Sequence, residues 1–167
     1  PDGTTVLVPN LTSGTISVIS TASNSVVATW TALSGPSAAA ASPTGSVVYV
    51  TDQYSNAVTV HSIASGSIVA TITGFTGPNS IAVTPNGRYL YVTNANASTV
   101  SVVDTSSNQI VSTVGVGSLP TSVAVSSDGS TAYVTNANAY TASVINTASN
   151  TVSTTISRVG IYPVSVV

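Results

Sequence analysis

The stretch YVTNANA occurs twice in this chain, at residues 91–97 and again at residues 133–139. The two copies begin 42 residues apart, and the same period divides the whole chain into repeats at 1–42, 43–84, 85–126 and 127–167. Repeats of 20 to 50 residues are typical of solenoids, propellers and arrays. One turn glycine recurs in every repeat, at Gly3, Gly45, Gly87 and Gly129.

Each repeat contains the pattern of four short strands. In the third repeat, a turn at Asn86-Gly87 is followed by apolar or alternating runs at 89–93, 99–104, 109–114 and 122–126. No segment shows a helical period of useful length. Four strands per 42 residues predict an all-β fold: a single β-propeller domain over 1–167 with four four-stranded blades, either closed or part of a larger ring or assembly. A parallel β-helix has shorter rungs, and a β-sandwich needs no uniform period.

The repeat also resembles a known family. Residues 78–109 read PNSIAVTPNGRYLYVTNANASTVSVVDTSSNQ, and YVTN itself stands at 91–94 and 133–136. This pattern resembles the YVTN family of β-propeller repeats, and the resemblance covers essentially the whole chain. It departs in the first repeat, where VLVPN stands at 6–10. The resemblance implies a microbial surface-layer or secreted protein. Propellers of this family commonly have seven blades.

The chain is offset against the blades. Its first repeat begins with the second strand of a blade, and its end supplies a first strand at 164–167, which comprises Val164, Ser165, Val166 and Val167. This offset predicts three arrangements. The last strand completes the first blade in a small ring, two chains form an eight-bladed ring, or the strand enters the open blade of another copy. The expected partners are therefore copies of the same chain.

The composition excludes several function classes. Charged residues make up 4% of the chain, against about 25% in typical soluble domains, and Arg88 and Arg158 are the only cations. We therefore expect no binding to nucleic acid or anionic lipid, which are held mainly by Lys and Arg. No apolar run is long enough for a transmembrane helix, so no membrane insertion is expected. The chain has no Cys, and its Val, Ile and Thr content predicts folding rather than disorder.

Few side chains are suited to catalysis. His61 is the only histidine, and its alternating neighbours VTVHSI predict a partly exposed strand position. Asp2 and Asp128 occupy equivalent hairpin turns, where turn formation explains them. The supply of His, Cys and carboxylates is too small for a zinc site. The sequence therefore predicts no enzyme, no catalytic residue, no metal site and no cofactor.

Two sets of loop residues are the candidates for binding. The first set follows the YVTN-type strands, where amide and carboxylate oxygens either form Asx turns or face a cation: Asn10, Asp52, Asn94 and Asn136. The second set lies in the loops before the inner strands and either packs under those loops or forms an apolar rim: Leu33, Phe75, Leu119 and Tyr162. Two N-glycosylation sequons begin at Asn10 and Asn96.

Three classes of function remain open at the level of the sequence. The leading hypothesis is an extracellular or cell-surface structural glycoprotein that self-assembles into a surface layer or filament. The alternative is a non-catalytic propeller that binds a ligand or protein, including a fragment of a seven- or eight-bladed ring. An enzyme of lactonase-like or dehydrogenase-like type is the third class, which the resemblance implies. It requires further blades to supply the missing acids or cofactor.

Overall fold

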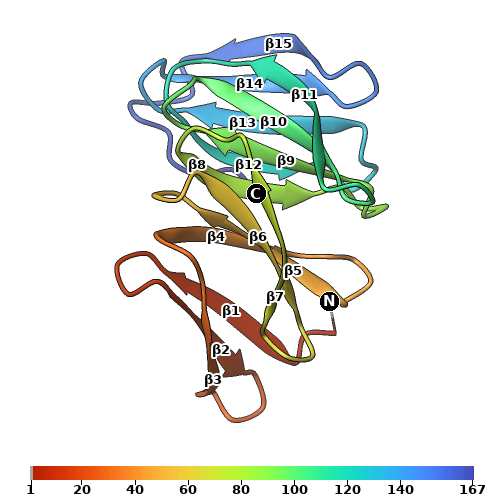
Figure 1. The fold of residues 1–167 in the computed structure, drawn as a ribbon. Helices are drawn as coiled ribbons and strands as arrows, with labels where there is room; N and C mark the ends of the chain where they lie inside the picture. Colours follow the sequence, from red (N-terminus) through yellow and green to blue (C-terminus); the bar gives the residue numbers. More distant parts are fainter. Residues whose placement is uncertain (1) are drawn as a thin grey trace.

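The computed structural model describes residues 2–167, which form strands, turns and loops without a helix (Figure 1). The strands make four antiparallel sheets, each built from strands that are consecutive in the chain. This is the meander of a propeller blade, and it confirms the predicted all-β propeller architecture. Among the described residues, no helix is available that could cross a membrane.

The four blades follow one another along the chain. Blade 1 contains β1 (Thr5–Asn10), β2 (Thr15–Ser20) and β3 (Ser25–Thr31). Blade 2 contains β4 (Pro36–Ala41), β5 (Val47–Asp52), β6 (Ala57–Ser62) and β7 (Ile68–Thr73). Blade 3 contains β8 (Pro78–Val83), β9 (Tyr89–Asn94), β10 (Thr99–Asp104) and β11 (Gln109–Gly115). Blade 4 contains β12 (Pro120–Val125), β13 (Thr131–Asn136), β14 (Thr141–Asn146) and β15 (Thr151–Ser157).

The turns form where the sequence places residues that tolerate positive φ. Asn24, Asn108 and Asn150 adopt φ of 51°, 55° and 53° in the turns between the two outer strands of their blades. Asparagine accepts this region because its side chain can bond the local backbone. The two outer strands of every blade also share a register shift, for example between Val102 and Val103, which increases the local twist.

The apolar core lies between blades, because the second strand of a blade directs one face toward the preceding blade and the other face toward the following blade. In β5, Val48 and Val50 pack toward blade 1, whereas Tyr49 packs into the cluster shared with blade 3. The same alternation places Tyr91 in the cluster shared by blades 3 and 4. The period of two along each strand therefore links consecutive blades, because both faces of a second strand are buried.

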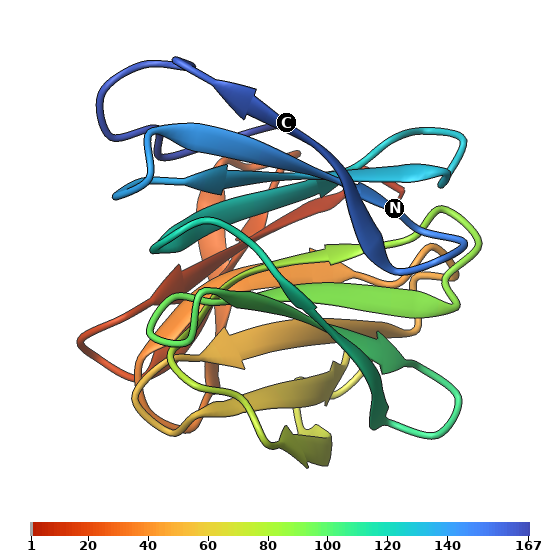
Figure 2. The ribbon, with the colours of Figure 1, turned by 90° about the horizontal axis from the view of Figure 1, so that it is seen from above.

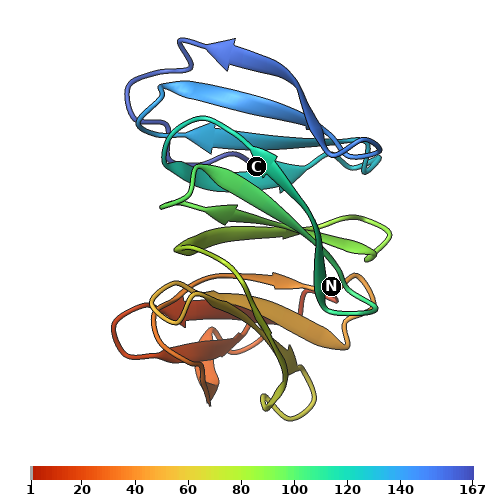
Figure 3. The ribbon, with the colours of Figure 1, turned by 45° about the horizontal axis from the view of Figure 1, so that its top comes forward.

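The blades form an open arc. The inner strands β4, β8 and β12 pack side by side, while blade 1 and blade 4 lie at opposite ends of the stack (Figures 1 and 3). The sheet of blade 1 contains three strands, and residues 164–167 do not join it. Closure of the first blade by the last strand of the same chain is therefore wrong for this structure. Figure 2 shows the strands of successive blades crossing with the twist of a propeller.

Candidate functional site

The two ends of the arc expose the two halves of a blade junction. Val6 and Val8 occupy the positions of Val48 and Val50, which are fully buried against the preceding blade. In blade 1 the same two positions are 49% and 38% exposed. At the other end Tyr133 is 38% exposed, although its equivalents Tyr49 and Tyr91 are buried in the junction with the following blade. At the junctions within the arc, the faces equivalent to these two pack against each other.

Residues 163–167 lie beside β12 in the place of a further inner strand. Within the arc, Ser37 Oγ donates to the Pro78 carbonyl at 3.3 Å, and the Val123 amide donates to Ser80 Oγ at 3.2 Å. After β12 both contacts recur. Thr121 Oγ1 donates to the Pro163 carbonyl at 3.0 Å, and the Val166 amide donates to Ser122 Oγ at 3.2 Å. The predicted assembly strand therefore has the position of the inner strand of a fifth blade.

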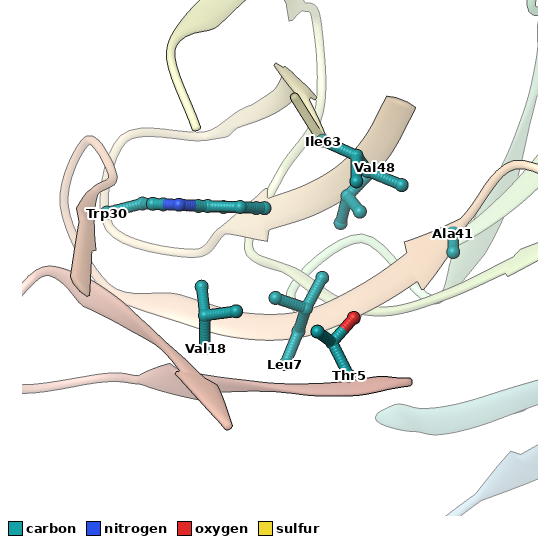
Figure 4. A pocket seen from close by; sticks show the side chains of 7 residues that line it. All are labelled: Thr5, Leu7, Val18, Trp30, Ala41, Val48 and Ile63. Atoms are coloured by element: carbon teal, nitrogen blue, oxygen red, sulfur yellow. The ribbon is translucent and has the colours of Figure 1, made fainter. Parts of the chain in front are cut away.

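A cavity of about 110 Å³ lies between blades 1 and 2 (Figure 4). Its walls come from both blades: Thr5, Leu7, Val18, Trp30, Ala41, Val48 and Ile63. In Figure 4 the indole of Trp30 is seen edge-on, with Val18, Leu7 and Thr5 below it. Leu7 stands where the following blades carry the buried tyrosines Tyr49 and Tyr91, and the sequence departure in the first repeat accounts for this space.

The predicted loop residues Asp52, Asn94 and Asn136 are buried at the ends of their strands. Asn94 Nδ2 donates to Thr99 Oγ1 at 3.1 Å and to Ser101 Oγ at 2.9 Å, and Asn136 Nδ2 makes the same pair of bonds to the equivalent hydroxyls of its own blade. Asn94 Oδ1 accepts the amide of Thr76 at 3.2 Å. Asp52 and Asn94 therefore bond both their own blade and the preceding linker, whereas Asn136 Oδ1 is buried without a hydrogen-bond partner.

Blade 2 replaces this amide network with an ionisable one. Asp52 Oδ2 accepts the hydroxyl of Thr59 at 2.6 Å, and Thr59 Oγ1 lies 3.0 Å from His61 Nε2. His61 Nδ1 lies 3.1 Å from the Gly66 carbonyl, which can only accept, so Nδ1 carries a proton. Burial raises the pKa of Asp52, against the lowering by the bonds from Thr59 and Leu33 and by the nearby His61.

The sequence prediction of a partly exposed His61 is wrong, because its side chain is fully buried. The indole of Trp30 in blade 1 covers it, with ring centroids 6.0 Å apart and planes 13° from parallel. The other repeats have Ile19, Val103 and Ile145 at this position. A signal existed in the sequence, since Asp52 and His61 are exceptions to their columns within the same repeat.

The two sequons differ in access. Asn96 is exposed in the turn between β9 and β10, whereas Asn10 is partly buried. Asn10 Nδ2, the atom to which an N-glycan would attach, donates to Thr15 Oγ1 at 3.2 Å and to Ser17 Oγ at 3.0 Å. The geometry therefore favours Asn96 over Asn10 as a modified residue.

The predicted apolar rim is divided between the surface and the interior. Phe75 is buried, Leu119 is half-buried, and Leu33 and Tyr162 are exposed. Phe75 packs in the cluster between blades 2 and 3, so it lies under its loop and does not form part of an exposed rim. Tyr162 has a positive φ of 58° in the segment before Pro163.

The remaining carboxylates lie apart, Asp2 and Asp128 in exposed turns and Asp104 at the end of β10, where it bonds the turn that follows. Asp2 Oδ1 accepts the Thr4 amide at 3.0 Å, and Asp104 Oδ1 accepts the Ser106 amide at 2.9 Å. Hydrogen bonds from Ser126 and Ser130 lower the pKa of Asp128 to about 2. Within residues 2–167, no three His or acidic side chains come together as metal ligands would. Asp2 and Asp128 stabilise their turns, as their positions before glycine suggest.

The comparisons with known proteins agree with this architecture. A family model described as "Lactonase, 7-bladed beta-propeller" matches residues 2–111. Among solved structures, the chain is similar to Kuenenia stuttgartiensis hydrazine synthase, with a TM-score of 0.76 and 31% identity over 81% of this chain and 39% of that chain. The present chain therefore spans well under half the length of that relative. A search of curated protein sequences found no match.

The family match extends over blades 1 and 2 and through most of blade 3, which is more than half of the chain. The arc of consecutive meander sheets is the structure that a propeller family requires. The chain therefore belongs to the lactonase, seven-bladed β-propeller family.

Proposed function

We propose that this chain is a non-catalytic, extracellular structural module that assembles with copies of itself by completing a propeller blade across the contact. The observation that carries the proposal is the complementarity of the two ends of the arc. One end exposes Val6 and Val8, and the other exposes Tyr133 beside the segment 163–167. Each set is the half of a blade junction that the other lacks.

The backbone supports the same pairing. β1 pairs with β2 along one edge, and within the described residues no strand pairs with its other edge. The corresponding edges of β5, β9 and β13 pair with inner strands that begin with proline. The segment 163–167 also begins with proline, and its Ser165 corresponds to Ser80 and Ser122. An extended segment adding to a free sheet edge is a general mode of recognition.

The same strand contact can give two products. Two copies whose blades curve enough to meet form an eight-bladed ring, and copies whose successive head-to-tail contacts do not close continue as a filament.

The surface is consistent with a glycosylated protein outside the cell. With 4% charged residues the chain has little electrostatic protection against non-specific association. A glycan on the exposed Asn96 would supply a hydrated layer on the loop face, away from the β1 edge. Intact-mass measurement of the native protein, before and after enzymatic release of N-glycans, tests this part separately.

The non-catalytic part of the proposal is supported by the placement of the acids. Asp2 and Asp128 are bonded within exposed turns, Asp104 bonds the turn that follows β10, and Asp52 is buried. The family name is the observation that favours the rival enzymatic function. A lactone-hydrolysis assay on the same preparation separates the two, because the structural proposal predicts a rate equal to the buffer blank.

Light scattering coupled to gel filtration, followed by electron microscopy, tests the assembly. We expect filaments or eight-bladed rings for the unmodified chain. Val8→Lys places a charge on the exposed junction half and should leave folded monomers, whereas Val27→Lys, on the exposed outer strand β3, should assemble normally. Removal of residues 163–167 should also give monomers. A monodisperse monomer of the unmodified chain, or unchanged assembly of Val8→Lys, would overturn the proposal.

A further inference from the structure

We propose that the cavity between blades 1 and 2 binds a small, apolar, single-ring aromatic molecule. The lining of this cavity comes from blades 1 and 2 of a single chain, so the site is present in the monomer. The first support for the proposal is the comparison of equivalent blade junctions, because the other junctions place the side chain of a tyrosine in the corresponding space.

Tyrosine fills the second and third junctions. Tyr49 is buried against blade 3, and Tyr91 is fully buried against blade 4, where its hydroxyl donates to Asn150 Oδ1 at 2.7 Å. The position in the first junction belongs to Leu7, which has no ring. The space that is left is a cavity of about 110 Å³. An apolar cavity of roughly 150 Å³ in another protein holds benzene, so this volume is of the right order for one ring.

The partners of the tyrosine hydroxyl are replaced at the same junction. The residue of blade 2 that corresponds to Asn150 is Gly66, and the residue that corresponds to Thr105, which lies beside the Tyr49 hydroxyl, is Ile63. The first junction therefore has leucine, glycine and isoleucine where other junctions have tyrosine, asparagine and threonine, so the aromatic ring and both of its polar neighbours are missing. A guest with a hydroxyl group would lose its hydrogen bonds to water and find few replacements, which disfavours phenols.

The walls suit an aromatic hydrocarbon. Val18 and Val48 are buried aliphatic walls, and Trp30 contributes its indole beside them (Figure 4). Ala41 adds space, because the other inner strands have Val83 and Val125 at its position. Thr5 supplies the one side-chain hydroxyl of the lining. A planar ring can contact the aliphatic walls by dispersion and the indole by stacking or edge-to-face packing.

Toluene and phenol are suitable probes because they are similar in size and differ in the hydroxyl. Trp30 is the only tryptophan of the chain and lines the cavity, so its fluorescence reports occupancy directly. We expect a saturable change of Trp30 fluorescence with toluene and a parallel rise of the unfolding temperature. Phenol should bind at least about ten-fold more weakly, since its hydroxyl is desolvated.

Variants of the walls make the test specific. Leu7→Phe places a ring in the cavity and should abolish the toluene response, and Ala41→Val, which restores the residue of the other blades, should weaken it. Val27→Phe adds the same ring on the exposed strand β3 and is the matched control, which should bind toluene as the unmodified chain does. Ile63→Thr restores a hydroxyl and should shift the preference toward phenol.

Two results would contradict a toluene site between blades 1 and 2. A linear, non-saturating fluorescence change would mean that toluene partitions into the protein without a site. Equal responses of the unmodified chain, Leu7→Phe and Ala41→Val would place the binding elsewhere. Either result overturns the proposal. Assembly of the copies, measured on the same samples, reports on the proposed structural function independently, because Leu7 packs toward blade 2 rather than toward another copy.

Discussion

The imidazole of His61 in blade 2 stacks under the indole of Trp30 in blade 1, with ring centroids 6.0 Å apart. The only histidine and the only tryptophan of the chain thus meet at one blade junction. Below them, Thr59 stands between His61 Nε2 and Asp52 Oδ2. When Asp52 is ionised and His61 is neutral, both Asp52 Oδ2 and His61 Nε2 are acceptors. The Thr59 hydroxyl has one proton and can donate to only one of them, so the other contact lacks a donor. An additional proton on Asp52 satisfies both contacts.

Asp52→Asn should stabilise the protein at neutral pH by on the order of 1 kcal/mol. The amide introduced by this substitution can donate to Thr59, as Asn94 does to Ser101, and the Thr59 hydroxyl is then free to donate to neutral His61. Urea unfolding at pH 7.5 measures the change. Asp104→Asn is the control, because Asp104 at the end of β10 bonds only the turn that follows it, and it should not stabilise the protein. A large loss of stability in Asp52→Asn would contradict the view that Asp52 and His61 compete for the one Thr59 proton.

The stability contributed by Asp52 should fall as the pH rises above its ordinary pKa. Burial raises the pKa of Asp52 above 3.8, so the folded state holds its proton at pH values where the unfolded state has lost it. This contribution is complete below pH 3.8 and is lost as the pH rises through the folded-state pKa. Asp2, Asp104 and Asp128 have lowered pKa values, so their contribution to stability is complete above pH 3.8 and is lost only as the pH falls below it. The stability difference between the unmodified chain and Asp52→Asn, measured by urea unfolding from pH 4 to 8, should therefore grow with pH.

Tyr91→Phe should destabilise the junction of blades 3 and 4 by about 1–2 kcal/mol. It removes the hydroxyl that donates to Asn150 Oδ1 at 2.7 Å and leaves that oxygen without this donor. Tyr133→Phe is the matched control, since Tyr133 is partly exposed and should change stability little in the monomer. Thermal unfolding of both variants under conditions that prevent assembly measures the difference. Equal effects would contradict the assigned role of the interblade bond.

Gly66→Ala should displace Trp30 and destabilise the protein by about 2 kcal/mol or more. Gly66 has a φ of 71°, and a methyl group there would lie 2.2 Å from Cδ1 of Trp30. The emission of Trp30 should shift toward that of a solvated indole. Gly115→Ala is the control, because nothing lies within 4 Å of the added atom, and it should be close to neutral. An unchanged emission spectrum in Gly66→Ala would show that the indole does not pack on this turn.

The repeated sequence pattern was sufficient to predict the blades. Strands predicted at 99–104 and 109–114 appear as β10 (Thr99–Asp104) and β11 (Gln109–Gly115), because alternation and turn chemistry are local properties that recur in every repeat. The offset of the chain against the blades, with the first strand of a blade coming from the preceding repeat, was also readable from the pattern. The propeller architecture followed from the same repeated residues.

Which residues meet across the blades depends on how the blades pack in three dimensions. The burial of His61 depends on Trp30, which lies 31 positions earlier in another blade, so the alternation around His61 could not reveal it. The cavity behind Leu7 depends on Ile63 and Ala41 in the next blade. The open arc depends on the curvature summed over the junctions between consecutive blades. Repeats determine local pairing, whereas contacts between repeats depend on the exceptions within each column, and their consequences appear only when the blades are packed together.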